Sequence, residues 1–571
     1  MNHPPKDHTW YYVASLFTTI IYSVCALKIA FASSYVVQDD ARQHIFWMHR
    51  FTNPKLFPTD NIADYFQAVD PSGYSGLYWL FNELGIEPII CHKILPFFLA
   101  LITAHYCYRV CLELFPIPIT GFFSVLLLNQ NLWMGDNLLS GTPRAFFYPL
   151  FLAFLYYFLK QSAILCAVII LLQIFFYPHT ALISLGVWLA NTIYCYFDHS
   201  SKPLNPLFRQ SKSQFIAITI LLIGIAILFS YPEKMAAFLP VTTANMARQL
   251  PEFGLEGRSA FFQHDALSFW LLGTRSALLP IEWPYILVIS FGAFLPLLYC
   301  WPQSFPLVHQ IKPNIYLLWQ IFSVSLLLFA LSHLVLFHLH LPSRYTHHTI
   351  RVILAFADAI FITVVLDALI KKCAQKLRTL SASIWLLVKN IIIVLTLSLL
   401  ILPSFAVFPY SYRLGYVQGK AKGLYRFFEQ QPIDIRIASL SEQSDFIPIF
   451  AKRSVLTGRE YSIPYHWGYY QPLRQKIIET IQAQYSDDLA VIQKFIQRYR
   501  IDFWLLDRAA FTQTYLLNNS WLWQFQPVSK NAANNLDKKL ILAQFISDCQ
   551  VYDDANFIVL ESRCLLDQAL E

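Results

Sequence analysis

Long apolar runs recur along the first three quarters of this chain, and polar segments separate them. A run of about 20 apolar residues is long enough to cross a lipid bilayer as one α-helix. The pattern therefore predicts a polytopic α-helical membrane domain at residues 1–409, with about eleven transmembrane helices. The expected helices lie at residues 10–31, 93–112, 117–134, 143–160, 162–178, 180–197, 214–231, 284–301, 314–337, 350–370 and 384–406.

The pattern changes in the tail, residues 410–571, where polar and charged residues mix with shorter apolar segments. Residues 433–440 and 502–507 are typical of short strands. Residues 470–485 and 488–499 have apolar positions three or four apart, as in amphipathic helices. Alternating strands and helices predict a small soluble α/β domain.

Two cysteines of the tail, Cys549 and Cys564, flank another predicted strand at residues 556–562. Disulfides form and persist outside the cytoplasm. A disulfide between these two residues is therefore expected if the tail is extracytoplasmic, and two free thiols are the alternative.

Clusters of lysine and arginine mark the loops that face the cytoplasm. Two such clusters occur, at residues 202–212 and 371–378. With about eleven spans and a cytoplasmic N-terminus, both clusters fall inside, although single arginines are nearly as numerous on the other side. The same count places the loops 32–92 and 232–283 outside, together with the tail. We therefore predict a multi-pass protein of the plasma (inner) membrane whose tail domain is extracytoplasmic.

The composition agrees with a membrane protein. Of the 571 residues, 56% are hydrophobic and 13% are charged, whereas soluble domains carry roughly 25% charged residues. The net charge of +7 is modest and no basic arm occurs, so no nucleic-acid partner is expected. The sequence also lacks a Walker loop, a GxGxxG motif and a CxxC pair, which argues against nucleotide cofactors and a cysteine zinc site.

An acidic pair stands just after the first apolar run. Residues 33–51, SSYVVQDDARQHIFWMHRF, place Asp39 and Asp40 beside the membrane surface, where carboxylates are costly unless they have a function. On a helix the two side chains would point about 100° apart, so we expect one of them to face a reaction centre. Such a carboxylate could accept a proton from an attacking hydroxyl or bind a divalent cation. The structural alternative is a helix cap stabilised through the helix dipole.

The acidic pair, a large first outer loop, the many spans and an outer α/β tail together resemble the GT-C glycosyltransferases. These are polytopic enzymes that take sugars from polyprenyl-phosphate carriers. The resemblance implies a hexosyl or pentosyl transferase of the cell envelope, acting on a glycan, lipid or protein acceptor at the extracytoplasmic face. In that superfamily the first outer loop holds the catalytic acid on a juxtamembrane helix, which is the position of Asp39 or Asp40. No subfamily is identified.

Arginines at the outer ends of two spans are the candidates for binding the donor phosphate. Arg144 lies in SGTPRAFFYP, residues 140–149, and Arg344 lies in LHLPSRYTHHTIR, residues 339–351, where the adjacent Tyr345 is a third candidate for binding the donor phosphate. A guanidinium presents several donors in a planar fork that suits phosphate. The resemblance gives Arg344 this role, because late outer loops of GT-C enzymes supply basic residues to the donor phosphate. Arginines that reach lipid headgroups are the alternative.

The long outer loop, residues 232–283, is predicted to fold over the site and to contact substrate through Arg258 and His264. Nothing in the sequence requires a cofactor, although Asp39 or Asp40 could bind a divalent cation, Mg²⁺ or Mn²⁺. The expected partners are the lipid-linked sugar donor, membrane lipids and the acceptor.

Other functions compete with this interpretation. A transporter or flippase of lipid-linked saccharides would typically have internal repeats and charges at mid-membrane. No repeat is clear, and Lys28 and Asp358 are the main charges inside predicted spans. A polysaccharide polymerase or ligase is also polytopic, but the α/β tail fits it less well. A structural protein whose tail binds a partner is a third alternative.

Overall fold

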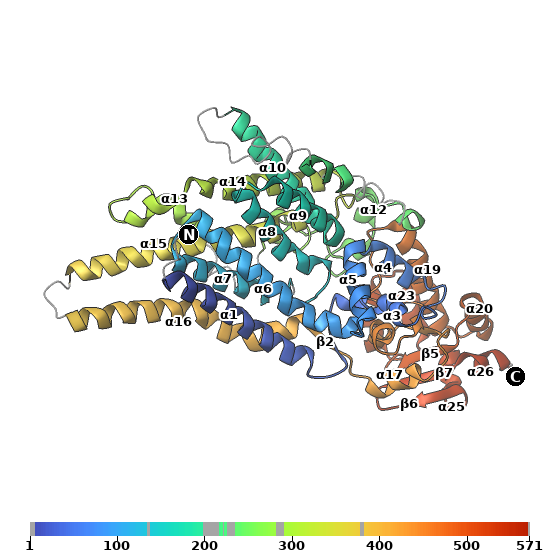
Figure 1. Cartoon of the computed structure of the whole chain (residues 1–571). Coiled ribbons are helices and arrows are strands. Elements are labelled where there is room, and N and C mark those ends of the chain that lie inside the picture. The colour runs from blue at the N-terminus through green and yellow to red at the C-terminus, as the bar shows by residue number, and fades with distance from the viewer. Residues whose placement is uncertain are drawn as a thin grey trace.

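The structure is a computed structural model that combines a helical body with a mixed tail. It describes residues 6–133, 137–197, 216–220, 222–224, 235–280, 291–376 and 382–568. In Figure 1 the long helices lie side by side at one end, and the strands of the tail lie at the other end, next to the C-terminus. The long helices of the body are α1 (Lys6–Ala30), α6 (Pro88–Leu114), α7 (Pro118–Trp133), α8 (Phe147–Leu159), α9 (Ala163–Phe176), α10 (Pro178–Phe197), α14 (Tyr316–Leu334), α15 (Ser343–Lys376) and α16 (Ala382–Gly415).

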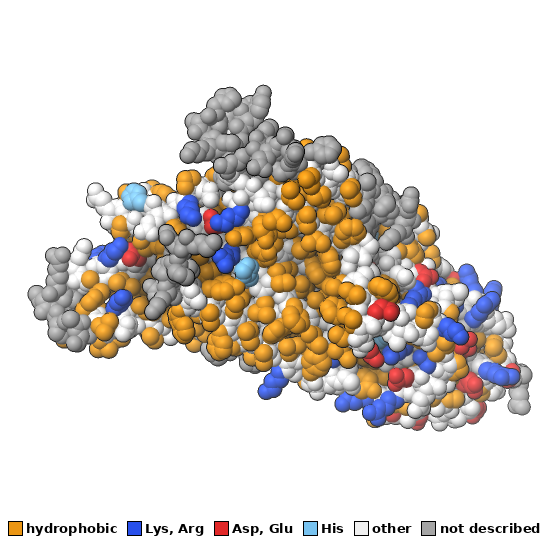
Figure 2. All heavy atoms as spheres, viewed as in Figure 1, with side chains coloured by type: hydrophobic (Ala, Val, Ile, Leu, Met, Phe, Trp, Pro, Cys, Tyr) orange, Lys and Arg blue, Asp and Glu red, His pale blue; other side chains and the backbone are white. Residues whose placement is uncertain are grey.

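Five helices of the described part are long and apolar enough to cross a membrane, as expected of a multi-pass membrane protein. They lie at Thr9–Ala30, Pro88–Leu114, Pro313–Leu334, Ser343–Gln375 and Ile384–Leu402. Two shorter apolar helices lie at Pro143–Leu159 and Ala163–Phe176. In Figure 2 hydrophobic side chains cover the middle of the visible face, and acidic and basic side chains gather over the tail.

The predicted helix count is therefore only partly reproduced. The predicted spans 117–134 and 180–197 correspond to α7 and α10, which are not among these five. The predicted span 214–231 lies mostly outside the described residues, as does the first part of 284–301. The remainder of 284–301 begins with two short helices, η8 (Phe291–Phe294) and α13 (Leu295–Leu298). Pro296 stands at the start of α13, and proline lacks the N–H that a continuous helix needs there.

Helix α7 lies at the centre of the body. It packs against α1, α6 and α15, and all of its side chains from Thr120 to Trp133 are buried. Within this packing, Asn129 Nδ2 donates to Thr19 Oγ1 over 2.8 Å. Such hydrogen bonds between apolar helices fix their register. This hydrogen bond holds the middle of α1 against α7, and the first loop starts where α1 ends.

The first loop is tied to the beginning of the tail by a small antiparallel ladder. Strand β1 (Val36–Gln38) pairs with β2 (Tyr416–Gln418), with Val37 opposite Val417. The loop continues through α2 (Ala41–His44), η1 (Phe46–Met48), α3 (His49–Thr52), α4 (Asn61–Val69) and α5 (Ser72–Glu83). The apolar positions of the 33–51 stretch, Val37, Ala41, Ile45 and Met48, are fully buried.

Short helices make up most of the remaining connections. They are η2 (Pro143–Phe146), η4 (Ala236–Phe238), α12 (Ala244–Gln249), η5 (Pro251–Phe253), η6 (Ser268–Leu272), η9 (Pro306–Gln310) and η10 (Pro313–Ile315).

The tail contains a five-stranded mixed sheet in the order β4-β3-β5-β7-β6. Strand β3 is parallel to β4 and β5, whereas β7 is antiparallel to β5 and β6. The strands are β3 (Arg436–Ser439), β4 (Ser454–Val455), β5 (Phe503–Asp507), β6 (Gln550–Asp553) and β7 (Phe557–Glu561). The helices are α17 (Lys422–Glu429), η11 (Glu442–Asp445), α18 (Ile447–Phe450), α19 (Trp467–Gln484), α20 (Leu489–Tyr499), α21 (Gln513–Asn518), α22 (Ser520–Trp523), α23 (Val528–Asn535), α24 (Ile541–Gln544), α25 (Ile546–Cys549) and α26 (Ser562–Asp567).

The predicted elements of the tail agree with these bounds. The expected strands at 433–440, 502–507 and 556–562 contain β3, β5 and β7, and the two expected helices match α19 and α20 within a few residues. Cys549 and Cys564 are joined by a disulfide with a Cα–Cα distance of 5.5 Å.

Candidate active site

The two aspartates lie at the turn between β1 and α2. The backbone N–H of Asp39 donates to the carbonyl of Gly415 over 3.1 Å, so the ladder with β2 fixes its position. Asp40 precedes α2, but its side chain makes no capping hydrogen bond. Instead Gln38 Oε1 accepts from the N–H of Ala41 over 3.2 Å. Both carboxylates are therefore available for contacts other than the helix cap expected as the structural alternative.

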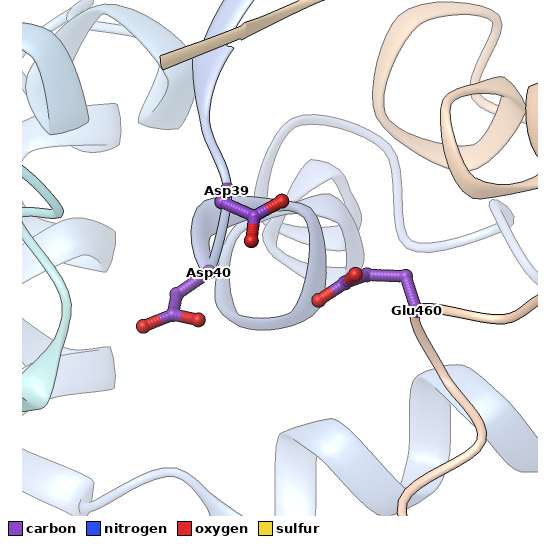
Figure 3. A group of neighbouring side chains, drawn as sticks. All are labelled: Asp39, Asp40 and Glu460. Carbon is purple, nitrogen blue, oxygen red and sulfur yellow. The ribbon is translucent and has the colours of Figure 1, made fainter. Parts of the chain in front are cut away.

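A third carboxylate meets this pair from the tail. Carboxylate oxygens of Asp39, Asp40 and Glu460 all lie within 4.8 Å of one another. In Figure 3 Glu460 extends from its loop toward the two aspartates. Glu460 is buried, and its backbone N–H donates to Asp445 Oδ1 over 2.9 Å. We call Asp39, Asp40 and Glu460 the carboxylate cluster.

Arg42 and the long loop 232–283, which we call the middle loop, hold the cluster together. Arg42 Nη2 contacts Asp39 Oδ1 and also Glu460 Oε2, the latter over 3.0 Å. From the middle loop, Arg258 Nη2 donates to Glu460 Oε1 over 2.7 Å. Gln43 donates to the same carboxylate oxygen. Residues of the first loop, the middle loop and the tail thus meet at one buried carboxylate. The sequence singled out Arg258 only as a possible substrate contact, and it did not single out Glu460.

Arg144 approaches the cluster from the helical body. Its Nη2 donates to Asp40 Oδ2 over 2.6 Å. The turn before it contains Gly141, which has a φ of 55° and comes so close to α6 that an added Cβ would lie 2.8 Å from the carbonyl oxygen of His92. Tyr78 donates to the carbonyl of Gly141 over 2.8 Å. The close approach that glycine permits therefore sets the position of Arg144.

Arg344 has a different environment from the other arginines. It is half-buried, and within the described part of the chain its guanidinium makes no hydrogen bond or ion pair. Its charge nevertheless acts on Asp40 and on Tyr177. A half-buried cation without a partner is costly, which makes Arg344 the group best placed to receive an anion.

Several histidine and tyrosine rings lie within reach of the charge of Arg344. The ring of His179 lies 5.0 Å from that of Tyr177 and 5.1 Å from that of His340, between centroids. His348 shares a hydrogen bond of 2.8 Å with the hydroxyl of Tyr148. Among the described residues, the buried atoms Nδ1 of His179 and Nε2 of His348 have no hydrogen-bond partner. Buried polar atoms are rarely left unpaired, so these rings offer further contacts to a polar ligand.

Two residues that the sequence suggested have other surroundings. Tyr345 is buried, and its hydroxyl donates to the carbonyl of Leu339 over 2.9 Å, so its proton is not available to an anion. His264 is exposed and, within the described part of the chain, makes no hydrogen bond.

The pKa values of Asp39 and Asp40 are shifted in opposite directions by their surroundings. Burial and the charge of Glu460 raise the pKa of Asp39 above its ordinary value, although Arg42 acts in the opposite direction. Burial also opposes the ionisation of Asp40, but Arg144, His44 and Arg344 together lower its pKa. Asp39 therefore takes up a proton more readily than Asp40, whereas Asp40 stays ionised beside Arg144.

Asp445 completes the buried polar network below Glu460. Burial raises the pKa of Asp445 to about 7, although Arg42 lies 3.9 Å away. Burial likewise opposes the ionisation of Glu460, but Arg258 and Arg42 lower its pKa. The guanidinium of Arg42 also lies 4.7 Å from the ring centre of Phe446.

The carboxylate cluster is an oxygen-donor set of the kind that Mg²⁺ or Mn²⁺ prefers. The second oxygens of Asp39 and Asp40 make no hydrogen bond with other described residues, so they fit such an ion. Arginines already balance the carboxylate charges. A cation held by Asp39, Asp40 and Glu460 would add positive charge beside any anion bound near Arg144 and Arg344.

An ion pair between His44 of α2 and the buried Asp70 supports this helix. His44 Nδ1 lies 2.5 Å from Asp70 Oδ1, and Trp47 Nε1 donates to Asp70 Oδ2 over 2.9 Å. Asp70 is buried. Burial lowers the pKa of an isolated histidine, but the charge of Asp70 raises the pKa of His44 above its ordinary value.

Replacing Asp70 with asparagine is expected to lower the free energy of unfolding by about 3–5 kcal/mol, because it leaves one partner of a buried ion pair alone. The raised pKa of His44 means that its contribution is complete below about pH 6.5 and is lost as the pH rises through that raised pKa. Unfolding of the detergent-solubilised protein between pH 5 and pH 9, followed by tryptophan fluorescence, measures both effects.

The matched control for this pair is Asp64→Asn, because Asp64 forms an exposed ion pair with Arg50 over 2.8 Å. Exposed pairs contribute about 0–1 kcal/mol. Equal stability of the Asp70→Asn and Asp64→Asn proteins would contradict a supporting role for the buried pair.

The comparisons with known proteins add structural likenesses only. No family model matches the chain, and no curated protein matches it in sequence. Among solved structures, the chain is similar to the archaeal oligosaccharyltransferase AglB from Archaeoglobus fulgidus in complex with an inhibitory peptide and a dolichol-phosphate. The identity is 9%, the TM-score is 0.48, and the match covers 91% of this chain and 72% of that chain.

The chain is also similar to ArnT from Cupriavidus metallidurans in the apo state. Here the identity is 13%, the TM-score is 0.47, and the match covers 98% of this chain and 99% of that chain. A structure of the Archaeoglobus fulgidus oligosaccharyltransferase in complex with Zn and sulfate has 10% identity and a TM-score of 0.45, over 90% of this chain and 70% of that chain. At these scores the likenesses assign no function, so the function of this chain has to be inferred from the geometry of its site.

Proposed function

We propose that this chain is an integral-membrane glycosyltransferase that moves a hexosyl or pentosyl group from a polyprenyl-phosphate carrier to an acceptor at the extracytoplasmic face. One observation carries the proposal. The carboxylate cluster stands where the helical body meets the tail, with Arg144 paired to it and the charge of Arg344, which has no partner among the described residues, acting on it. Acid–base groups and anion-binding groups are thus combined at the edge of an apolar helical body.

Asp39 is our candidate for the general base. Its side chain is 45% exposed, and its pKa is raised, both of which suit a group that must meet an acceptor and take its proton. The acceptor oxygen or nitrogen would attack the anomeric carbon and lose its proton to Asp39. The bond between that carbon and the phosphate oxygen would break, and its electrons would leave with the carrier phosphate.

Arg344 and Arg144 are our candidates for stabilising the departing phosphate. Negative charge builds up on the phosphate oxygens as the sugar leaves, and fixed positive groups stabilise it most when they are in place beforehand. Arg144 is fixed by Asp40 over 2.6 Å. His179 Nδ1 and His348 Nε2, which have no hydrogen-bond partner among the described residues, could donate or accept hydrogen bonds to the same ligand, since the charge of Arg344 acts on both rings.

The proposal includes a division of the chain into a transmembrane domain, residues 1–409, and an extracytoplasmic domain, residues 410–571. The disulfide in the tail supports an extracytoplasmic location of residues 410–571, because disulfides persist outside the cytoplasm. Arg258 and Glu460 would then bring the middle loop and the tail over the reacting groups from the outer side.

The test is the release of the carrier. Purified protein is reconstituted in liposomes with a panel of polyprenyl-phosphate-linked hexoses and pentoses and with an extract of cell-envelope acceptors. We expect polyprenyl phosphate to appear, by mass spectrometry, for at least one donor. Its absence across the whole panel would contradict the proposed function.

A further inference from the structure

A polar cleft in the tail lies outside the carboxylate cluster and the arginines paired with it. Its volume is about 480 Å³, within the range of about 300–1,000 Å³ that small-molecule sites occupy. Its lining includes the polar residues Ser441, Glu442, Arg459, Asp507, Tyr515 and Asn518.

The cleft opens at the carboxyl ends of two parallel strands. Ser441 follows β3 by two residues, and Asp507 is the last residue of β5. Strand β3 has β4 on one side and β5 on the other, both parallel to it. From β3 the chain runs first to β4 on one side and then crosses to β5 on the other side, so the direction of the strand order reverses beside β3. In α/β sheets, ligands bind outside the carboxyl ends of strands at such a point.

Its floor is held by hydrogen bonds. Asp507 accepts from the Ser441 hydroxyl over 2.8 Å and from the Tyr515 hydroxyl over 2.6 Å. One carboxylate is therefore fixed by two donors, and the Tyr515 ring is fixed beside it. Phe557 adds a second aromatic ring to the lining.

Its rim carries unpaired polar groups. The side chains of Glu442, Arg459 and Asn518 are exposed, and none of them makes a hydrogen bond within the described part of the chain. Their flat carboxylate, guanidinium and carboxamide groups each offer two neighbouring polar atoms. Such groups can bind two adjacent hydroxyls at once, and an aromatic ring can pack against the C–H face of a sugar.

The charges of the lining favour a neutral ligand. Arg459 is the one cation among the residues that line the cleft, and Glu442 and Asp507 are acidic. A phosphate would meet two carboxylates, and a lipid chain would meet mostly polar side chains. A polyhydroxylated molecule satisfies all of these groups.

The cleft is connected to the candidate active site through consecutive residues. Arg459 lines the cleft, and the next residue, Glu460, belongs to the carboxylate cluster. Arg258 Nε donates to the carbonyl of Arg459 over 3.2 Å. The charge of Arg459 also contributes to the environment of Glu460. A molecule bound in the cleft would therefore lie beside the reacting groups, on the side of the tail.

We propose that this cleft binds a neutral saccharide unit of the acceptor. The proposal rests on the proposed glycosyltransferase function, because it gives the acceptor a carbohydrate part. Asn518, Arg459 and Glu442 would bind its hydroxyls, and Tyr515 would pack against its ring.

Saturation-transfer NMR on the full chain in lipid nanodiscs tests this site without any donor. The probes are maltotriose, N,N′-diacetylchitobiose and β-1,4-galactobiose. We expect saturation of sugar protons for at least one probe, and a dissociation constant at least about tenfold higher for Asn518→Ala and for Arg459→Ala.

Gln513→Ala is the matched control, because Gln513 is an exposed amide on the same short helix as Asn518 but is not part of the lining. It should bind the saccharide as the wild-type protein does. No saturation with any probe, or equal affinity for all three variants, would overturn the saccharide site. The NMR experiment contains no donor, so a failure of carrier release in the liposome assay would not change the measured saccharide binding. A failure of saccharide binding would likewise not change the measured carrier release.

Discussion

Replacing Asp39 with asparagine is expected to lower the turnover number for sugar transfer about 10²–10⁴-fold, because a positioned general base contributes a factor of that size. Asparagine keeps the shape of the side chain but cannot take the proton. Arg42 still has Glu460 at 3.0 Å and Asp445 at 3.9 Å, so its charge stays compensated and the fold should be retained. Initial rates at saturating donor and acceptor, measured on the purified proteins, give the effect.

Asp64→Asn is the control, because it makes the same chemical change on an exposed residue of the first loop. The raised pKa of Asp39 adds a second expectation, since a base acts only when it is deprotonated. Activity of the wild-type protein should fall as the pH drops through that pKa, above the ordinary aspartate value of about 3.9. If the Asp39→Asn protein turns over as fast as the Asp64→Asn protein, the assignment of Asp39 as the general base is contradicted.

Replacing Arg344 with alanine is expected to raise the KM for the donor about ten- to hundredfold. Hydrogen bonds to charged groups contribute about 1.5–3 kcal/mol, and each 1.4 kcal/mol is a factor of ten. Arg344 has no partner among the described residues, so its removal leaves no other side chain unpaired. Donor kinetics at fixed acceptor concentration measure the change.

Two further variants make the Arg344 result specific. Arg344→Lys keeps the charge but loses the planar fork, so its KM should lie between those of the wild-type and alanine proteins. Arg248→Ala removes an exposed arginine of the middle loop and should leave the KM unchanged. If Arg344→Ala has the same donor KM as Arg248→Ala, Arg344 contacts lipid headgroups and not the donor.

The local features of the site could be predicted from the sequence. Asp39 and Asp40 follow a long apolar run, and Arg144 stands at the start of another, so the cost of charge near a bilayer singles them out. Arg258 was expected only as part of a long loop over the site. The structure brings Arg258 and Arg144 to the carboxylate cluster by way of Glu460 and Asp40.

Glu460 could not be predicted, because its role depends on contacts far away along the chain. It lies 418 residues from Arg42, to which it is bound. It occupies a polar segment between β4 and α19 with no periodic pattern around it. A conspicuous aromatic and basic sequence, Arg459 to Tyr469, surrounds it, and that composition was the one local signal.

The helical expectation for the acidic pair was wrong. We expected Asp39 and Asp40 to point about 100° apart on one helix. Helix α2 begins only at Ala41, and the aspartates occupy the turn before it, so both reach the same cluster. The hydrophobic pattern alone could not reveal this, because the ladder that sets the turn pairs Val37 with Val417, in a strand far away along the chain.

The fate of a labelled sugar tests the central claim most directly, since it distinguishes transfer from transport. Vesicles containing the purified protein receive a polyprenyl-phosphate carrier with a radiolabelled sugar, together with the acceptor extract. Chromatography then shows whether the label has left the carrier. A glycosyltransferase is expected to move the label into acceptor material and to leave polyprenyl phosphate, in wild-type vesicles but not in Asp39→Asn vesicles. Label that crosses the bilayer while still attached to its carrier would contradict the proposal and would indicate a flippase.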